Sequence, residues 1–350
     1  MDIELINYKN QKIKEAINNY NNNLKNLNNQ LNISIKIINS SRLINKRQLL
    51  NNVINDYNNK VNILRNNLNN IINSINNLTN IPGRIITPTQ ILRTEPSKFA
   101  LLIGINYNNT PNELYGCIND ANNINNLLTE KYNYNSNNIT LLTDNTQKKP
   151  TKSIILNELN LLLDNSISGD KLFLFYSGHG TNFFDTNNDE KDGQDESIVP
   201  LDATNKSTCI LDDELNNIIR TKLKENVYMF SLFDCCHSGT ILDLKFNYLD
   251  GINNDIQTIN ILVQETTGKI LMISGCKDNQ VSMDSVINNK NAGALTYSFL
   301  QSLQNYNNEN ITCKTLLNSI RNILKENNYE QVPQLASGKL INIDNENINL

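Results

Sequence analysis

Histidine is scarce in this 350-residue chain, which has only His179 and His237. Each stands just after an apolar run, residues 171–176 in the first case and residues 228–233 in the second. In an α/β sheet, residues just past the carboxyl ends of strands line the crevice where ligands bind. The sequence therefore predicts that two strands deliver one imidazole and an adjacent pair of cysteines to the same rim.

The six cysteines contain no CxxC pair and no dense disulfide framework. The N-terminus lacks the basic and apolar regions of a signal peptide, and no run approaches the roughly 20 apolar residues that span a bilayer. We therefore expect a soluble cytoplasmic protein with reduced thiols and no membrane partner.

The chain also lacks a strong excess of either positive or negative charge, because its net charge is only −4. Residues 1–81 carry ten Lys/Arg against four Asp/Glu, which makes this region +6 and leaves −10 for the remainder. The positive charge is diffuse, without a basic cluster or interleaved aromatics, and this argues against a nucleic-acid partner.

Glycine and proline are absent from the first 81 residues, and Pro82 and Gly83 are the first of each. In this Asn-rich region apolar residues recur at alternating spacings of four and three, at Leu50, Ile54, Tyr57, Val61, Leu64, Leu68, Ile71, Ile75 and Leu78. That spacing is typical of a coiled coil or a helical hairpin. A weaker series precedes it over residues 17–31, and the alternating Ile33-Ile35-Ile37 is predicted to join the two helices.

We therefore predict a helical, coiled-coil-like extension over residues 1–81 that allows self-association, followed by a linker over residues 82–97. A partly disordered Asn-rich tail is the alternative, because asparagine is a mediocre helix former.

Strands and helices alternate from Lys98 onward. Strands are predicted at residues 99–106, 139–143, 171–176, 228–233 and 269–274, with an edge strand at 331–336. Helices are predicted at residues 120–132, 152–164, 212–223, 292–304 and 314–326. This alternation favours one α/β domain, over residues 98–345, with helices on both faces of a mostly parallel sheet.

The imidazole and the cysteine pair suit nucleophilic catalysis. A thiol attacks a carbonyl group as the thiolate, and a nearby imidazole lowers the thiol pKa. The amide of Gly180, next to His179, is expected to form an oxyanion hole with the amide of Cys236. A cysteine peptidase is the leading interpretation. On the residues alone, a structural His179 in a tight glycine turn stays open, and so does the choice between Cys235 and Cys236.

His237 directly follows Cys236, and successive side chains at an extended strand end point in opposite directions. We therefore expect His237 to be structural. A zinc site built from the Cys-Cys-His run is rejected, because three adjacent ligands cannot converge tetrahedrally on one ion and no second cluster exists.

The segments Tyr176-Ser177-Gly178-His179-Gly180 and Asp234-Cys235-Cys236-His237-Ser238-Gly239 resemble the His and Cys boxes of metacaspases, peptidases of the caspase-like fold that cleave after Arg or Lys. Residues 99–107, 114–121, 274–280 and 293–297 resemble further boxes of that family. The resemblance implies a caspase-like three-layer sandwich around a mostly parallel sheet. It also implies that Cys236 is the nucleophile, that His179 is its partner and that Cys235 is structural.

By the same resemblance, the residues that match Cys117, Asp120, Ser177 and Asp234 build the specificity pocket. Two carboxylates in a partly buried pocket favour a guanidinium or ammonium ligand, which agrees with cleavage after Arg or Lys. Taken alone, Asp120 is also explained as an aspartate favoured by the dipole at a helix N-terminus.

Residues 185–196 superficially fit an EF-hand loop, but Glu190 stands where that loop requires glycine. The resemblance to calcium-dependent metacaspases instead implies a Ca²⁺ site built from Asp195, Asp212, Asp213 and Asp243. Converging carboxylates repel one another without a cation, so Ca²⁺ is the expected activator. Solvated loop acids with a helix-capping Asp212 are the alternative.

The short stretch before the strand at residue 269 resembles the compact type I arrangement, with Lys245 and Lys269 as candidate self-cleavage points. We therefore predict a calcium-stimulated, self-processing cysteine endopeptidase that cuts after Arg or Lys in proteins or peptides. The alternative is a catalytically idle scaffold of caspase fold that assembles through its N-terminal helices.

Overall fold

The computed structural model describes residues 3–40, 45–76, 93–184, 194–235, 241–249, 256–261, 263–275, 284–287, 290–304, 306 and 311–350. The chain divides into two compact units, Met1–Gln90 and Ile91–Leu350. No helix in the described part of the chain has the length and apolarity needed to cross a membrane.

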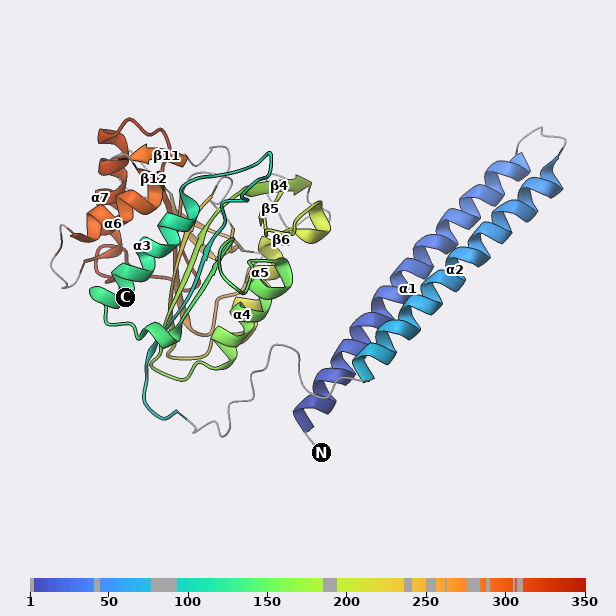
Figure 1. Ribbon diagram of the computed structural model, residues 1–350, viewed down its shortest axis with the longest axis horizontal. Helices are drawn as coiled ribbons and strands as arrows, with labels where there is room; N and C mark the ends of the chain where they lie inside the picture. Colours follow the sequence, from blue (N-terminus) through green and yellow to red (C-terminus); the bar gives the residue numbers. More distant parts are fainter. Residues whose placement is uncertain are drawn as a thin grey trace. The chain divides into compact units, whose positions relative to one another are not determined.

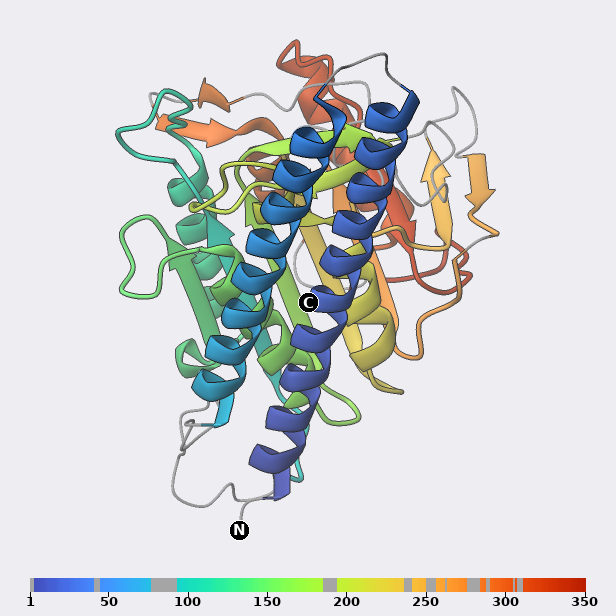
Figure 2. The same cartoon turned by 90° about the vertical axis from the view of Figure 1, so that its right-hand side faces the viewer.

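Two long antiparallel helices, α1 (Ile3–Ser40) and α2 (Lys46–Asn76), form the first unit (Figures 1 and 2). The prediction that residues 33–37 join the two helices was wrong, because α1 continues through them. Ile38 is buried, whereas Ile33 and Ile37 are exposed. Packing of α1 along α2 thus outweighs the strand preference of alternating isoleucines.

The second unit is built on an eight-stranded sheet in the order β2-β1-β3-β7-β10-β13-β8-β9. The first five are parallel: β2 (Ile139–Thr143), β1 (Lys98–Gly104), β3 (Lys171–Ser177), β7 (Tyr228–Asp234) and β10 (Lys269–Ser274). The last three are antiparallel: β13 (Gln334–Ser337), β8 (Phe246–Leu249) and β9 (Ile256–Ile259). The parallel strands are continuous apolar runs because both faces of the sheet are covered.

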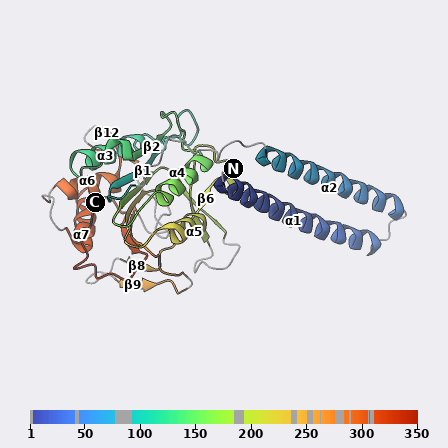
Figure 3. The ribbon, with the colours of Figure 1, turned by 90° about the horizontal axis from the view of Figure 1, so that it is seen from below.

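Helices cover both faces of this sheet (Figures 1 and 3). One face packs against α3 (Cys117–Glu130), α6 (Ala294–Gln304) and α7 (Cys313–Glu326), and the other against α4 (Lys152–Asp164) and α5 (Asp212–Lys222). Alternation along β3 sends Phe173 and Phe175 into the first core and Leu172, Leu174 and Tyr176 into the second. The predicted three-layer sandwich around a mostly parallel sheet is confirmed.

Several short strands were not predicted. A three-stranded sheet contains β4 (Gly180–Phe184), β5 (Gln194–Ile198) and β6 (Ile210–Leu211), and β11 (Asp284–Ile287) pairs with β12 (Lys290–Gly293). Residues 292 and 293 belong to β12 and not to the predicted helix, because their backbone pairs with β11. Two 3₁₀ turns, η1 (Ser136–Asn138) and η2 (Lys206–Thr208), complete the described elements.

Candidate active site

The parallel strands β3 and β7 end side by side at one rim of the sheet. Ser177 and Asp234 are register partners there. His179 and Cys236 each lie two positions further along the chain. Cys236 and His237 are outside the described residues, whereas Cys235 is buried. The two residues of the expected catalytic pair therefore follow strand ends that lie at the same level of the sheet.

One ring nitrogen of His179 is engaged by the backbone. Its Nε2 lies 2.7 Å from the carbonyl oxygen of Asn112. A carbonyl oxygen only accepts, so Nε2 carries the hydrogen and Nδ1 of the neutral ring is the nitrogen that accepts a proton. The Tyr107 ring packs on the imidazole at a centroid distance of 4.7 Å. Sequence reasoning did not single out Asn112 or Tyr107, because both act through the folding of the loop after β1.

The backbone of His179 is held by two tyrosine hydroxyls. Its N–H donates to Tyr107 Oη (2.9 Å), and its carbonyl accepts from Tyr176 Oη (2.8 Å) and from the amide of Val199 (3.1 Å). Burial raises the pKa of Tyr107 and of Tyr176 well above the ordinary tyrosine value. Both hydroxyls therefore keep their protons over the physiological pH range.

Asp120 and Asp234, together with Ser177, form a buried group that we name the acidic pocket after the specificity pocket that the resemblance implies. Ser177 Oγ and the amide of Gly293 donate to Asp120 Oδ2, at 3.1 and 2.9 Å. The amide and hydroxyl of Thr296 donate to Asp234 Oδ2, at 2.8 and 2.7 Å. A Cβ atom on Gly293 would collide with both carboxylates. A glycine is therefore needed where the two acids approach.

All the residues predicted for the specificity pocket come from three neighbouring elements. Cys117 begins α3, Asp120 lies in its first turn, and Ser177 and Asp234 end β3 and β7. Each of the four is buried. Asp120 does lie in the first turn of a helix, as the alternative explanation required. The helix dipole alone, however, does not explain why its carboxylate is completely buried near that of Asp234. Gly293 and Thr296 lie in a segment that was noted for its resemblance, without a role for either residue.

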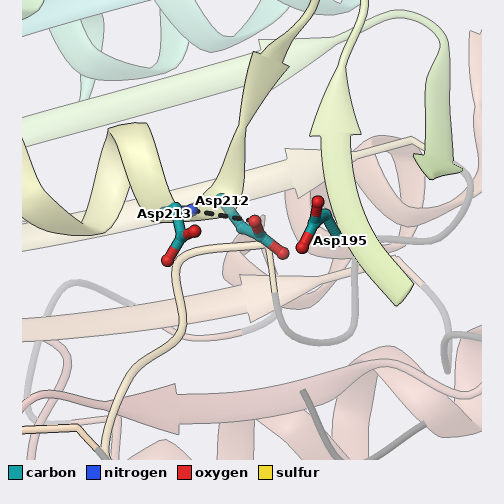
Figure 4. Close-up of side chains that lie close together, drawn as sticks. All are labelled: Asp195, Asp212 and Asp213. Carbon is teal, nitrogen blue, oxygen red and sulfur yellow. Dashed lines mark hydrogen bonds between the residues drawn. The ribbon is translucent and has the colours of Figure 1, made fainter. Parts of the chain in front are cut away.

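Asp195, Asp212 and Asp213 form a second group, which we name the acidic cluster (Figure 4). One carboxylate oxygen of each lies within 4.8 Å of the others. Asp195 belongs to β5, and Asp212 and Asp213 begin α5. The amides of Glu196 and Asp213 donate to Asp212, at 2.7 and 2.8 Å. Burial, assisted by the charge of Asp213, nevertheless raises the pKa of Asp212 to about 6.

Asp243, the fourth residue predicted for the metal, is not in the group of mutually close carboxylates found among the described residues. It is buried and has a φ of 42°. Its carbonyl accepts a hydrogen bond from Asn216 Nδ2 of α5, at 2.9 Å. Asp243 is thus attached through its backbone to the helix that begins with Asp212 and Asp213.

Sequence reasoning missed a lysine at the acidic cluster. Lys206 Nζ lies 2.5 Å from Asp195 Oδ2 and donates to the carbonyl of Phe184 at 2.8 Å. One of the three carboxylates is therefore already paired with a cation of the chain itself. Three converging carboxylates remain a donor set of hard oxygens that suits Ca²⁺.

The three-stranded sheet connects His179 with the acidic cluster. β4 begins directly after His179 and pairs with β5, with Gly180 opposite Ile198 and Phe183 opposite Asp195. Asp195 and His179 are therefore linked through two paired strands.

The two candidate self-cleavage lysines are both in ion pairs. Lys269 begins β10 and lies 2.9 Å from Glu346. Lys245 directly precedes β8 and lies 3.9 Å from Glu265.

Comparison with known proteins shows the family of the chain. A family model described as the metacaspase, peptidase C14 domain matches residues 98–245. Metacaspase-1 of Saccharomyces cerevisiae is 32% identical over 313 residues, covering 73% of this chain and 70% of the yeast protein. Metacaspase-1 of Schizosaccharomyces pombe is 34% identical over 285 residues, covering 68% and 66%.

A crystal structure of a protein from Geobacter sulfurreducens has a similar fold, with a TM-score of 0.53 and 23% identity. The similarity covers 72% of this chain and 97% of that protein. Together with the sequence relatives, these findings identify the chain as a member of the metacaspase family of cysteine peptidases, with a caspase-like fold.

Proposed function

We propose that this peptidase cleaves after Arg or Lys, that Cys236 and His179 form its catalytic dyad, and that Ca²⁺ activates it. The observation that carries the proposal is the acidic pocket, in which Asp120 and Asp234 approach Gly293 at the rim that also holds His179. Two buried carboxylates beside a catalytic imidazole favour a cationic side chain next to the scissile bond.

His179 acts first as base and then as acid. Its Nδ1 takes the proton of the Cys236 thiol, and the thiolate forms a bond to the carbonyl carbon of the substrate. When the tetrahedral intermediate collapses, the C–N bond breaks and His179 gives the proton to the leaving amine. Water, deprotonated by His179, then hydrolyses the thioester and restores the thiol.

The register of β4 and β5 supports a role for Gly180 in the oxyanion hole. The amide of Val199 donates to the His179 carbonyl, so these two residues occupy a hydrogen-bonded position of the antiparallel pair. The next pair, Gly180 and Ile198, is then a non-hydrogen-bonded one. The Gly180 amide therefore faces away from β5, as a donor to an oxyanion must.

The hydrogen bonds within the acidic pocket support selection of Arg and Lys. Four hydrogen bonds to Asp120 and Asp234 come from neutral groups, namely a serine hydroxyl, a threonine hydroxyl and two backbone amides. Neutral donors fix the position of a carboxylate and leave its charge. The negative charge of the two carboxylates attracts an Arg or Lys side chain of the substrate and repels an acidic one.

The acidic cluster fits a calcium ion, because its three carboxylates are hard oxygen donors and one of them has a raised pKa in this crowded site. Asp195, Asp212 and Asp213 would hold the ion, and Asp243 would contribute from the segment attached to α5. The bound ion supplies positive charge at the small sheet. Asp195 would leave its ion pair with Lys206 to hold the ion, and β4 and β5 link Asp195 to the segment of His179 and Gly180.

The test is hydrolysis of matched fluorogenic peptides that end in Arg, Lys or Asp, with calcium and with a chelator. We expect cleavage after Arg and Lys only, stimulation by calcium, and loss of activity in Cys236→Ala and in His179→Ala. Retained activity in either variant would contradict the dyad. Cleavage after Asp would contradict the assigned pocket, and equal rates in chelator would contradict activation by calcium. No cleavage of any peptide by the folded protein would favour the idle scaffold.

A further inference from the structure

We infer that Tyr107 and Tyr176 are positioning residues that together fix the backbone, the ring plane and the tautomer of His179. The inference rests on the proposed role of His179 as the base of the dyad. Neither tyrosine is required to touch the substrate. Both act through the histidine, and we name the pair the tyrosine clamp.

The hydroxyl of Tyr107 is inserted between two strands. On one side of the pair formed by His179 and Val199, the amide of Val199 donates directly to the His179 carbonyl at 3.1 Å. On the other side, the His179 amide donates to Tyr107 Oη at 2.9 Å, and that hydroxyl donates to the Val199 carbonyl at 2.6 Å. An antiparallel pair normally exchanges both bonds directly. Here a side chain replaces one of them at the position of the catalytic histidine.

Tyr176 completes the clamp from the core of the sheet. Its hydroxyl donates to the His179 carbonyl at 2.8 Å and lies 3.2 Å from the hydroxyl of Tyr107. A Cβ atom on Gly178 would lie 2.7 Å from Tyr176 Oη and 3.0 Å from Tyr107 Oη. The glycine before the histidine therefore leaves the space that the two hydroxyls occupy.

Tyr107 has a conformation that is uncommon for a bulky residue, with a φ of 53°. The loop around it is held by Asp144, whose carboxylate accepts the amides of Asn106 (2.8 Å) and Asn108 (3.1 Å). Such backbone outliers persist where the surrounding structure imposes them, and they cluster at functional sites. Here the outlier sets the aromatic ring against the imidazole.

The loop that contains Tyr107 and Asn112 therefore contacts His179 in three places. The Tyr107 ring lies 4.7 Å from the imidazole centroid, the Tyr107 hydroxyl holds the amide of His179, and the Asn112 carbonyl lies 2.7 Å from Nε2. If the backbone of His179 shifts, Nε2 moves away from that carbonyl and the preference for hydrogen on Nε2 is lost. The clamp thus keeps Nδ1 as the proton acceptor that the dyad requires.

The test compares Tyr107→Phe and Tyr176→Phe with Tyr248→Phe as a matched control. Tyr248 is also buried, and its hydroxyl also bridges a backbone amide and carbonyl, both of Ile341 and both at 3.1 Å, but it lies in the opposite core. All three variants lose the same kind of hydrogen bonds. A merely structural role therefore predicts three similar losses of thermal stability and nothing more.

The first readout is the ¹⁵N chemical shift of the histidine ring nitrogens, which separates the two tautomers. The chain has only two histidines, so His179→Ala assigns the spectrum. We expect the hydrogen on Nε2 of His179 in the parent protein and in Tyr248→Phe, and a mixture of tautomers in Tyr107→Phe and Tyr176→Phe.

The second readout is peptide hydrolysis. We expect kcat to fall about ten-fold or more in the two clamp variants, because small misplacements of a catalytic group have such effects, while KM stays within about two-fold. Tyr107→Leu, which loses the ring as well, should fall further than Tyr107→Phe. Should one clamp variant fail to fold, the other carries the test.

The inference is overturned if the clamp variants keep either the parent tautomer or the parent kcat. If that happens while His179→Ala is inactive, the clamp is wrong and the proposed dyad stands. If His179→Ala itself keeps its activity, the proposed function is wrong regardless of the tyrosines.

Discussion

The acidic pocket contains two buried aspartates and the acidic cluster two buried and one half-buried, yet their surroundings differ. In the pocket, neutral donors such as Thr296 hold each carboxylate. In the cluster, three carboxylates face one another, Lys206 pairs with Asp195, and the pKa of Asp212 is raised to about 6. We propose that the first arrangement binds a cationic side chain of the substrate and that the second binds a multivalent ion. The neighbours of an aspartate therefore indicate what it binds.

The largest expected effect is that of Asp234→Asn. The substitution keeps an oxygen for Thr296 and removes the charge that we propose attracts the substrate side chain. We expect kcat/KM for Arg peptides to fall about 1000-fold, because a desolvated charge pair loses one partner. Calcium affinity should not change. Asp164→Asn, at an exposed ion pair with Lys222, is the matched control and should leave hydrolysis intact. A fall of less than about ten-fold would contradict the role of Asp234 in binding the substrate side chain.

Another buried carboxylate, Asp170, is the reference case of an aspartate that is paired with an arginine of the chain. Arg93 binds it with two hydrogen bonds, and the amides of Ser97 and Ile167 donate to it, each at 2.8 Å. Burial acts to raise the pKa of Asp170, but the bonds from Arg93 and the amides outweigh it, and the pKa is lowered. Asp170→Asn should therefore cost about 3 kcal/mol of unfolding free energy at pH 7.

The sign of the pH dependence follows from that lowered pKa. The stabilisation is present above the unfolded pKa of about 3.9 and is lost as the pH falls through the folded value. Denaturant unfolding of the parent and of Asp170→Asn should therefore converge as the pH falls below about 4. A constant difference between them down to low pH would contradict the ion-pair account.

At the acidic cluster, Asp212→Asn removes one of three charges and keeps an acceptor for the Glu196 amide. We expect calcium to bind about 100-fold more weakly, since affinity at such sites follows the number of charged ligands. Isothermal titration calorimetry measures this without reference to activity. An unchanged Kd would show that the cluster is not the calcium site.

The smallest effect concerns Lys206. Replacing it with methionine removes the cation that competes for Asp195, so calcium should bind about ten-fold more tightly. The calcium-free protein should at the same time lose thermal stability, because Asp195 keeps its charge without a partner. Lys222→Met, at the exposed pair with Asp164, is the control and should change neither quantity. Weaker calcium binding by Lys206→Met would contradict the claim that Lys206 competes with calcium for Asp195.

The central strands and helices could be predicted because their apolar residues follow clear periods. β2, α4 and β10 have the predicted bounds, and the rim position of His179 follows from the strand before it. The short strands β4 to β6 could not be predicted, since they have two to five residues without a clear apolar period and pair with segments distant in the chain. The continuation of α1 through residues 33–37 was also missed, because it depends on packing against α2, which the local sequence does not show.

The composition of the acidic pocket followed from the resemblance, but the donors that position its acids did not. Thr296 and Gly293 come from the α6 side of the sheet, far from Asp120 and Asp234 in sequence. Likewise Tyr107 and Lys206 carry no local signal, because a tyrosine after a strand or a lysine in a turn is common. Their roles come from contacts that only the folded chain creates.

Covalent labelling with two peptide acyloxymethyl ketones, one ending in Arg and one in Asp, tests the central claim most directly. Intact mass followed by peptide mapping shows which of the six cysteines is modified. We predict that the Arg reagent labels Cys236 alone, faster with calcium and negligibly in His179→Ala, and that the Asp reagent labels none. Labelling of Cys235, or equal labelling by both reagents, would contradict the assigned nucleophile or the assigned pocket.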